Sequence, residues 1–167
     1  MKSPAGLVSA AALATLLSPL ALAANGHADA FMKKAIEGNL AEIQVGQLAQ
    51  QKGSTDGIRH LAAVLEQDHS KANQEATTTA SSMGVTPPTE PSRTEQAEYQ
   101  RLAALSDHSF DRAFVKDMVK DHEKDIAEFR KEAKSGSGDA AAYAKASLPT
   151  LEKHLHMAQS LERRPGG

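Results

Sequence analysis

The chain has 167 residues, with 21 acidic side chains against 19 basic ones and no cysteine. This length suits one domain with a substantial hydrophobic core. The lack of cysteine excludes a disulfide-stabilised scaffold, and the slightly acidic balance argues against a nucleic-acid partner.

The N-terminal residues have the pattern of a bacterial signal peptide. A positive start, Met1-Lys2, precedes an apolar run over residues 6–22, which ends in the small-x-small sequence Ala21-Leu22-Ala23. We therefore expect a signal peptide at 1–23, cleavage after Ala23 and a periplasmic domain at 24–167. The run is too short to favour a membrane-spanning helix, although an uncleaved anchor is the alternative. No segment of the mature chain has the composition of a membrane span.

Two helices joined by a short turn follow. In the first, predicted over about residues 29–51, apolar and small side chains advance by threes and fours along one face, and Glu42 occupies a position in that series. Gly53 should end this helix. The second helix should begin at a cap in Ser54-Thr55-Asp56 and end near Met83-Gly84, and its apolar face contains His69.

Two more long helices follow an extended connection. Residues 84–108 contain three prolines and a short predicted helix within 94–105. A third long helix is predicted over about residues 109–134, with His122 on its apolar face. A Ser-Gly turn leads to a fourth, capped by Asp139 and running to about Arg163. Its apolar face contains His154, and Pro149 should kink or restart it.

The lengths of the connections predict the topology. Each short turn makes an antiparallel hairpin of two helices, and the long connection crosses from one hairpin to the other. We therefore predict an all-α, ferritin-like four-helix bundle with a short extra helix in the crossover. An up-down bundle with a decorated loop is the alternative.

Each long helix places one metal-capable side chain on the stripe that should face the core: Glu42, His69, His122 and His154. Such a group in a core is costly unless it is paired, hydrogen-bonded or bound to a metal. Asp68 and Asp121 each precede a core histidine and lie on the flank of the stripe, where they could bind the metal or orient an imidazole. These six residues form the predicted metal site.

One carboxylate and three imidazoles suit a single Zn, Fe or Mn ion, with Cu a weaker candidate. Glu66 lies three residues before His69, as in the Glu-x-x-His motif of di-iron bundles. Leu151 takes the corresponding position before His154, so a two-iron centre is not expected. The competing interpretation is a buried polar network, in which Glu42 pairs with protonated histidines and the aspartates accept their remaining N–H groups.

At these residues the chain resembles a known family. The segments that carry the resemblance are Phe31–Glu42, Asp68–Asn73, Phe110–Phe114, Met118–Lys124, and Leu148–Leu151 leading to His154. They are similar to bacterial exported proteins of unknown function once labelled predicted outer-membrane proteins. The resemblance implies a ferritin-like fold and export, but no settled activity. The chain departs from the family pattern at Asp107-His108 and at Phe114.

Two functions compete. The first is periplasmic binding of a transition metal, in metal buffering or in an oxidative or envelope stress response. The second is a non-enzymatic stress or interaction protein of the envelope, whose buried polar groups only fix the fold. An enzyme, such as a metal-dependent oxidase, is the least favoured interpretation, because the sequence shows neither an open coordination position nor a substrate path. The sequence does not decide whether the chain forms a homo-oligomer or which proteins it contacts.

Overall fold

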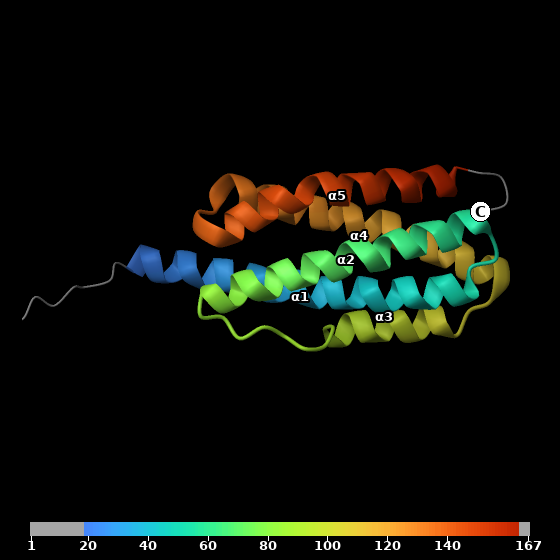
Figure 1. The fold of residues 1–167 in the computed structure, drawn as a ribbon, viewed down its shortest axis with the longest axis horizontal. Helices are drawn as coiled ribbons and strands as arrows, with labels where there is room; N and C mark the ends of the chain where they lie inside the picture. Colours follow the sequence, from blue (N-terminus) through green and yellow to red (C-terminus); the bar gives the residue numbers. More distant parts are fainter. Residues whose placement is uncertain (1–18, 164–167) are drawn as a thin grey trace, which may run out of the picture.

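Residues 19–163 of the chain are described by a computed structural model, and these residues form five α-helices and no strand. The helices are α1 (Pro19–Lys52), α2 (Asp56–Ser82), α3 (Arg93–Ala103), α4 (Asp107–Ser135) and α5 (Gly138–Glu162). α1 and α2 pack as one hairpin, α4 and α5 as the other, and α2 lies against α5 while α3 runs beside α1 (Figure 1). The predicted all-α bundle of two hairpins and a crossover helix is confirmed, and its packing is consistent with a ferritin-like bundle.

The first hairpin turns where the sequence predicts. The N–H of Gly53 donates to the Ala49 carbonyl over 2.9 Å, and a Cβ at Gly53 would lie 2.6 Å from Cγ2 of Ile58. Only glycine fits this close approach. The side chain of Thr55 then caps α2 by accepting a hydrogen bond of 3.3 Å from the N–H of Ile58.

Close packing of the two helices in this hairpin depends on a second glycine. A Cβ at Gly46 of α1 would lie 2.9 Å from the carbonyl oxygen of Ala62 and 3.1 Å from the backbone nitrogen of Glu66, both on α2. Neither backbone atom can move independently of its helix. The absence of a side chain at Gly46 therefore allows α1 and α2 to approach each other this closely.

The ends of some helices differ from the predictions. α1 begins at Pro19 rather than near residue 29, so it runs through the predicted cleavage position after Ala23. Residues 1–18 of the predicted signal peptide lie outside the described residues. The predicted cap at Asp139 is wrong: Ser137 is the N-cap, and Asp139 lies in the first turn of α5. α5 continues through Pro149 without restarting, because burial of residues on both sides, Ala144 and Leu151, holds the helix against the bundle.

Within the described residues 19–163, no helix combines the length and the hydropathy that crossing a lipid bilayer requires.

The interior of the bundle is divided along its length into two apolar clusters. Phe31, Phe129 and Tyr143 belong to one, and Leu65 and Phe114 to the other. On every long helix, a buried polar side chain comes between the residues of these two clusters. These side chains, which we call the polar layer, are Asn39 and Glu42 on α1, His69 on α2, His122 on α4 and His154 on α5.

Candidate metal centre

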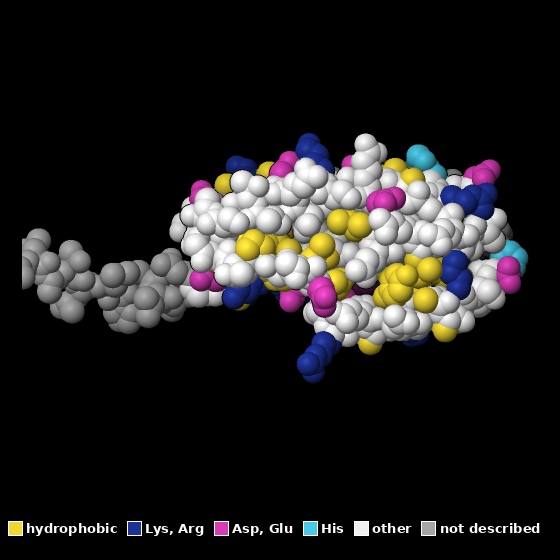
Figure 2. All heavy atoms as spheres, turned by 60° about the horizontal axis from the view of Figure 1, so that its bottom comes forward, with side chains coloured by type: hydrophobic (Ala, Val, Ile, Leu, Met, Phe, Trp, Pro, Cys, Tyr) yellow, Lys and Arg dark blue, Asp and Glu magenta, His cyan; other side chains and the backbone are white. Residues whose placement is uncertain are grey.

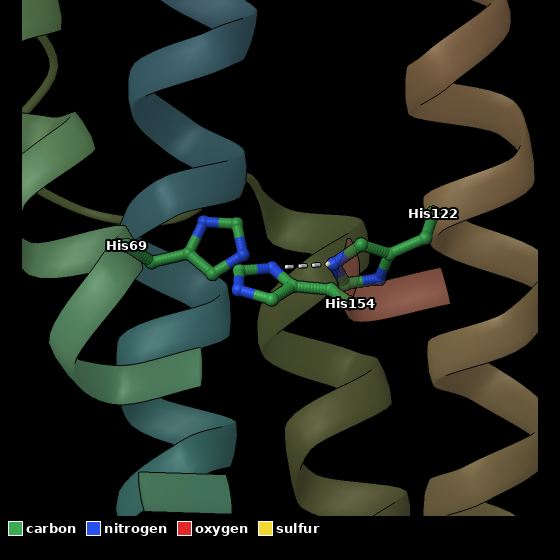
Figure 3. A group of neighbouring side chains, drawn as sticks. All are labelled: His69, His122 and His154. Carbon is green, nitrogen blue, oxygen red and sulfur yellow. Dashed lines mark hydrogen bonds between the residues drawn. The ribbon is translucent and has the colours of Figure 1, made fainter. Parts of the chain in front are cut away.

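Three histidines meet in the polar layer from three different helices. His69 is 5% exposed, and His122 and His154 are each 1% exposed. One ring nitrogen of each lies within 4.8 Å of the corresponding nitrogens of the other two. Figure 3 shows the three rings turned toward one another from α2, α4 and α5. Within residues 19–163, these three histidines form the group of side chains that could hold a metal ion.

His122 is oriented by its own helix. Its Nδ1 lies 3.0 Å from the carbonyl oxygen of Met118, one turn earlier on α4. A carbonyl oxygen can only accept a hydrogen bond, so Nδ1 carries the proton. In the neutral ring, Nε2 is therefore the nitrogen with a free lone pair.

His69 is oriented by a chain of hydrogen bonds from other helices. Its Nδ1 lies 2.9 Å from Oδ1 of Asn39 on α1. Nδ2 of Asn39 donates to the hydroxyl of Tyr143 over 3.1 Å, and this hydroxyl in turn donates to the Ala72 carbonyl over 3.4 Å. The amide is thereby fixed with its oxygen toward His69, so Nδ1 of His69 donates and Nε2 keeps the lone pair.

His154 is oriented by a carboxylate. Its Nε2 lies 2.9 Å from Oδ2 of Asp68, and Lys153 donates to the same oxygen over 3.0 Å. Burial alone would raise the pKa of Asp68, but the hydrogen bonds from His154 and Lys153 outweigh it and hold that pKa below its usual value. The carboxylate is thus ionised and accepts, which leaves the lone pair of His154 on Nδ1.

In all three neutral rings the outer nitrogen is the donor, so three lone pairs face the centre of the group. Nε2 of His122 lies 3.3 Å from Nδ1 of His154, and Nε2 of His69 is buried without a hydrogen-bond partner. Two lone pairs 3.3 Å apart repel each other unless a proton or a metal ion lies between them. This is the arrangement in which neutral imidazoles bind a metal, each with its second N–H held by an oxygen.

Burial keeps these rings neutral. It lowers the pKa of His122 to about 4. It also lowers the pKa of His69 well below the usual value, with a further contribution from the other two histidines. Burial lowers the pKa of His154 as well, although Asp68 opposes the shift. At neutral pH the three rings are therefore uncharged, which is the form that binds a metal.

A small cavity connects the group with the surface between α2 and α5. Its volume is about 170 Å³, and Asp68, His69 and His154 line it together with Lys71 and Glu75. Asp68 is partly exposed, with 28% of its side chain accessible. A carboxylate and two of the three imidazoles thus border the same cavity.

The six residues predicted as one site lie in two places. His69, His122, His154 and Asp68 are joined by the contacts described above. Glu42 is not part of the three-histidine group. With Asp121 it lines a different cavity, between α1, α3 and α4. Asp68 faces a ring nitrogen rather than the centre of the group, so its geometry is that of an orienting acceptor.

Sequence reasoning did not identify Asn39 or Tyr143 as part of the site. Asn39 lies three residues before Glu42 on the buried face of α1, so its position in the apolar stripe was a usable signal. Tyr143 lies on α5, far from Asn39 in the sequence. Its hydroxyl reaches Asn39 across 104 positions of sequence, and no local pattern encodes such a contact.

Comparison with known proteins identifies a family and a fold, and leaves the activity open. The sequence model of a family described as "Domain of unknown function (DUF4142)" matches residues 14–161. No curated protein matches the chain. The crystal structure of a DUF305 fragment from Deinococcus radiodurans matches with a TM-score of 0.70 and 16% identity, covering 82% of this chain and 96% of that chain. At this identity the likeness shows the fold alone.

Proposed function

The chain belongs to this family of unknown function, DUF4142, and we propose that it binds one transition-metal ion between His69, His122 and His154. The observation that carries the proposal is the direction of the three ring N–H groups. Each points outward to an oxygen acceptor, so each ring offers its lone pair to the centre. Metal-binding histidines are held in this way by acceptors on their second nitrogen.

The donor set favours Zn²⁺. Two nitrogens bound to one tetrahedral zinc ion lie about 3.4 Å apart, given Zn–N bonds of about 2.0–2.1 Å. The 3.3 Å between the inner nitrogens of His122 and His154 is close to this value. Imidazole also suits Fe²⁺ and Cu²⁺, whereas Mn²⁺ prefers oxygen ligands. A site of three histidines without a carboxylate is therefore expected to bind Mn²⁺ less well than Zn²⁺, Fe²⁺ or Cu²⁺.

A purely structural network explains the same residues less completely. It would leave Nε2 of His69 buried and unpaired, and such a group costs about 1–3 kcal/mol. It would also hold two ring lone pairs against each other at 3.3 Å. A bound ion removes both penalties.

The proposed role is to hold a metal rather than to turn over a substrate. The cavity that reaches the histidines has a volume of about 170 Å³, whereas small-molecule sites usually occupy roughly 300–1,000 Å³. A buried site beside a small cavity is suited to metal buffering, including protection during oxidative or envelope stress. The predicted signal peptide at 1–23 supports a periplasmic location, and the mass of the purified mature protein would test cleavage after Ala23.

Elemental analysis of the untagged chain, produced with its own leader, tests the metal site. We expect one transition-metal ion per chain, its loss in the His69→Ala/His122→Ala double variant, and its retention in His156→Ala. His156 is an exposed histidine two residues beyond His154 on the same helix, so it controls for adventitious binding.

Circular dichroism would establish that the double variant remains helical. The proposal fails if the double variant holds as much metal as the unaltered protein. It also fails if the unaltered protein binds no Zn²⁺, Fe²⁺ or Cu²⁺ on titration.

A further inference from the structure

A second cavity lies away from the histidines, between α1, α3 and α4. Its volume is about 610 Å³, and seven carboxylates and four lysines line it. Apolar side chains of Val45, Leu102 and Met118 line it as well. Figure 2 brings the side with α3 forward, and acidic side chains appear there next to hydrophobic ones.

One carboxylate in this cavity is buried without a partner. Glu42 is 7% exposed, and its Oε2 forms no hydrogen bond. Lys34, which also lines the cavity, pairs instead with Glu128 over 2.5 Å. Burial, and then the nearby charges of Asp125 and Asp121, raise the pKa of Glu42 well above its usual value. A buried carboxylate among other carboxylates requires a cation to be stable in its ionised form.

The shape of the cavity favours a long organic cation over a metal ion. A single ion needs several oxygens converging on one point. Among the described residues, the side chains close enough together to hold one metal ion are the three histidines. The carboxylates of this cavity do not form a second group of that kind. They are instead distributed around a space that falls in the size range of organic-ligand sites, roughly 300–1,000 Å³.

We propose that this cavity binds a linear aliphatic polyamine. One ammonium group would donate to Glu42, where it forms the charge-assisted hydrogen bond that the carboxylate lacks. The methylene chain would lie against Val45, Leu102 and Met118, and a second ammonium group would reach the carboxylates nearer the mouth. Spaced positive charges joined by apolar segments match a cavity whose negative charges are spaced and whose wall is partly apolar.

Calorimetric titration of the metal-free full chain with spermidine tests the proposal. We expect saturable binding that Glu42→Gln weakens by at least about tenfold, because truncating one partner of a buried charge pair is costly. Glu123→Gln removes the same charge from an exposed position on α4 outside the cavity, and should change the affinity by less than about twofold. Asp125→Asn is a second cavity variant, and it should weaken binding even if Glu42→Gln fails to fold.

Other outcomes would overturn the proposal. These are the absence of spermidine binding, equal weakening by Glu123→Gln, or saturable binding of Mg²⁺ or of a lysine-rich peptide in place of spermidine. The His69→Ala/His122→Ala variant should bind spermidine as the unaltered chain does. The polyamine site and the metal centre can therefore fail independently.

Discussion

Nε2 of His122 and Nδ1 of His154 lie 3.3 Å apart within one hairpin, that of α4 and α5. Each ring directs its other nitrogen at an oxygen that accepts its N–H, the Met118 carbonyl and the Asp68 carboxylate. Two of the three candidate ligands thus come from one pair of helices, although Asp68, the acceptor that orients His154, lies on α2. The third, His69, is supplied by the other hairpin, so the complete group depends on how the hairpins dock.

Removing the acceptor for His69 should weaken metal binding. Asn39→Ala leaves Nδ1 of His69 without its oxygen and frees the ring to rotate, and we expect the affinity for Zn²⁺ to fall about 10–100-fold. Tyr143→Phe keeps the acceptor but loses the hydroxyl that fixes the amide, so its effect should be smaller. Competition with a chromogenic chelator measures both, with exposed Gln44→Ala as the control. Unchanged affinity in Asn39→Ala would show that the amide does not orient the ligand.

The pH dependence of stability should reveal the buried His122. Its pKa falls from 6.5 to about 4 on folding, so the unfolded chain takes up a proton at a higher pH than the folded chain. The free energy of unfolding therefore has its full value above pH 6.5, where His122 is neutral in both states. It decreases by about 3 kcal/mol as the pH falls toward 4. Urea unfolding of the metal-free protein at pH 7 and pH 4 should show this loss reduced in His122→Leu. Equal pH dependence in the two proteins would contradict the assignment.

Asp125 should change the pH dependence of stability in the direction opposite to His122. Burial raises its pKa to about 6, with Glu128 and Asp121 adding to the shift and Lys124 opposing it. The ionised form is therefore disfavoured in the fold, and stability is lost as the pH rises from about 4 to about 6. Asp125→Asn should stabilise the chain at pH 7 by about 1–3 kcal/mol and have little effect at pH 3.5. A variant that is less stable than the unaltered protein at pH 7 would exclude this account.

The close approach of α1 and α2 can be tested at Gly46. Alanine there meets backbone atoms of α2 at 2.9 and 3.1 Å, so the helices must separate. We expect a net loss of about 1–3 kcal/mol of unfolding free energy, even though alanine favours a helix by about 1 kcal/mol over glycine. Gly38→Ala is the matched control on the same helix, because the nearest atom to its Cβ, Oε1 of Glu95, lies at 3.9 Å. Thermal unfolding should show Gly46→Ala destabilised and Gly38→Ala unchanged or stabilised.

Helical periodicity was sufficient to find the histidines. A buried face repeats every three or four residues, and His69, His122 and His154 each occupy such a position on a helix whose ends local signals define. The same reasoning grouped Glu42 with them, because it treats all residues on one apolar face of α1 as facing the same part of the core. In the folded chain, Asn39 on that stripe contacts His69, whereas Glu42 turns to the cavity beside α3. Positions three residues apart on a helix differ by about 60° around its axis, which is enough to meet different neighbours.

The parts of the site that the sequence did not predict depend on contacts between distant segments. The hydrogen bond between Asn39 and Tyr143 and that between Asp68 and His154 join helices of different hairpins. Their existence depends on the rotation of each helix and on the depth at which the hairpins dock. Neither quantity can be obtained from the period of one segment.

The separation of the ligands along the chain has a further consequence. His69 and His122 are joined through the crossover, and an ion that bound both would close a loop of about 50 residues, for which the loop-entropy relation for covalent cross-links gives roughly 4 kcal/mol. The sequence has no cysteine with which to make such a link. A bound ion would thus act as a reversible cross-link between the two hairpins of the bundle. The free energy of unfolding would then increase with the concentration of available metal.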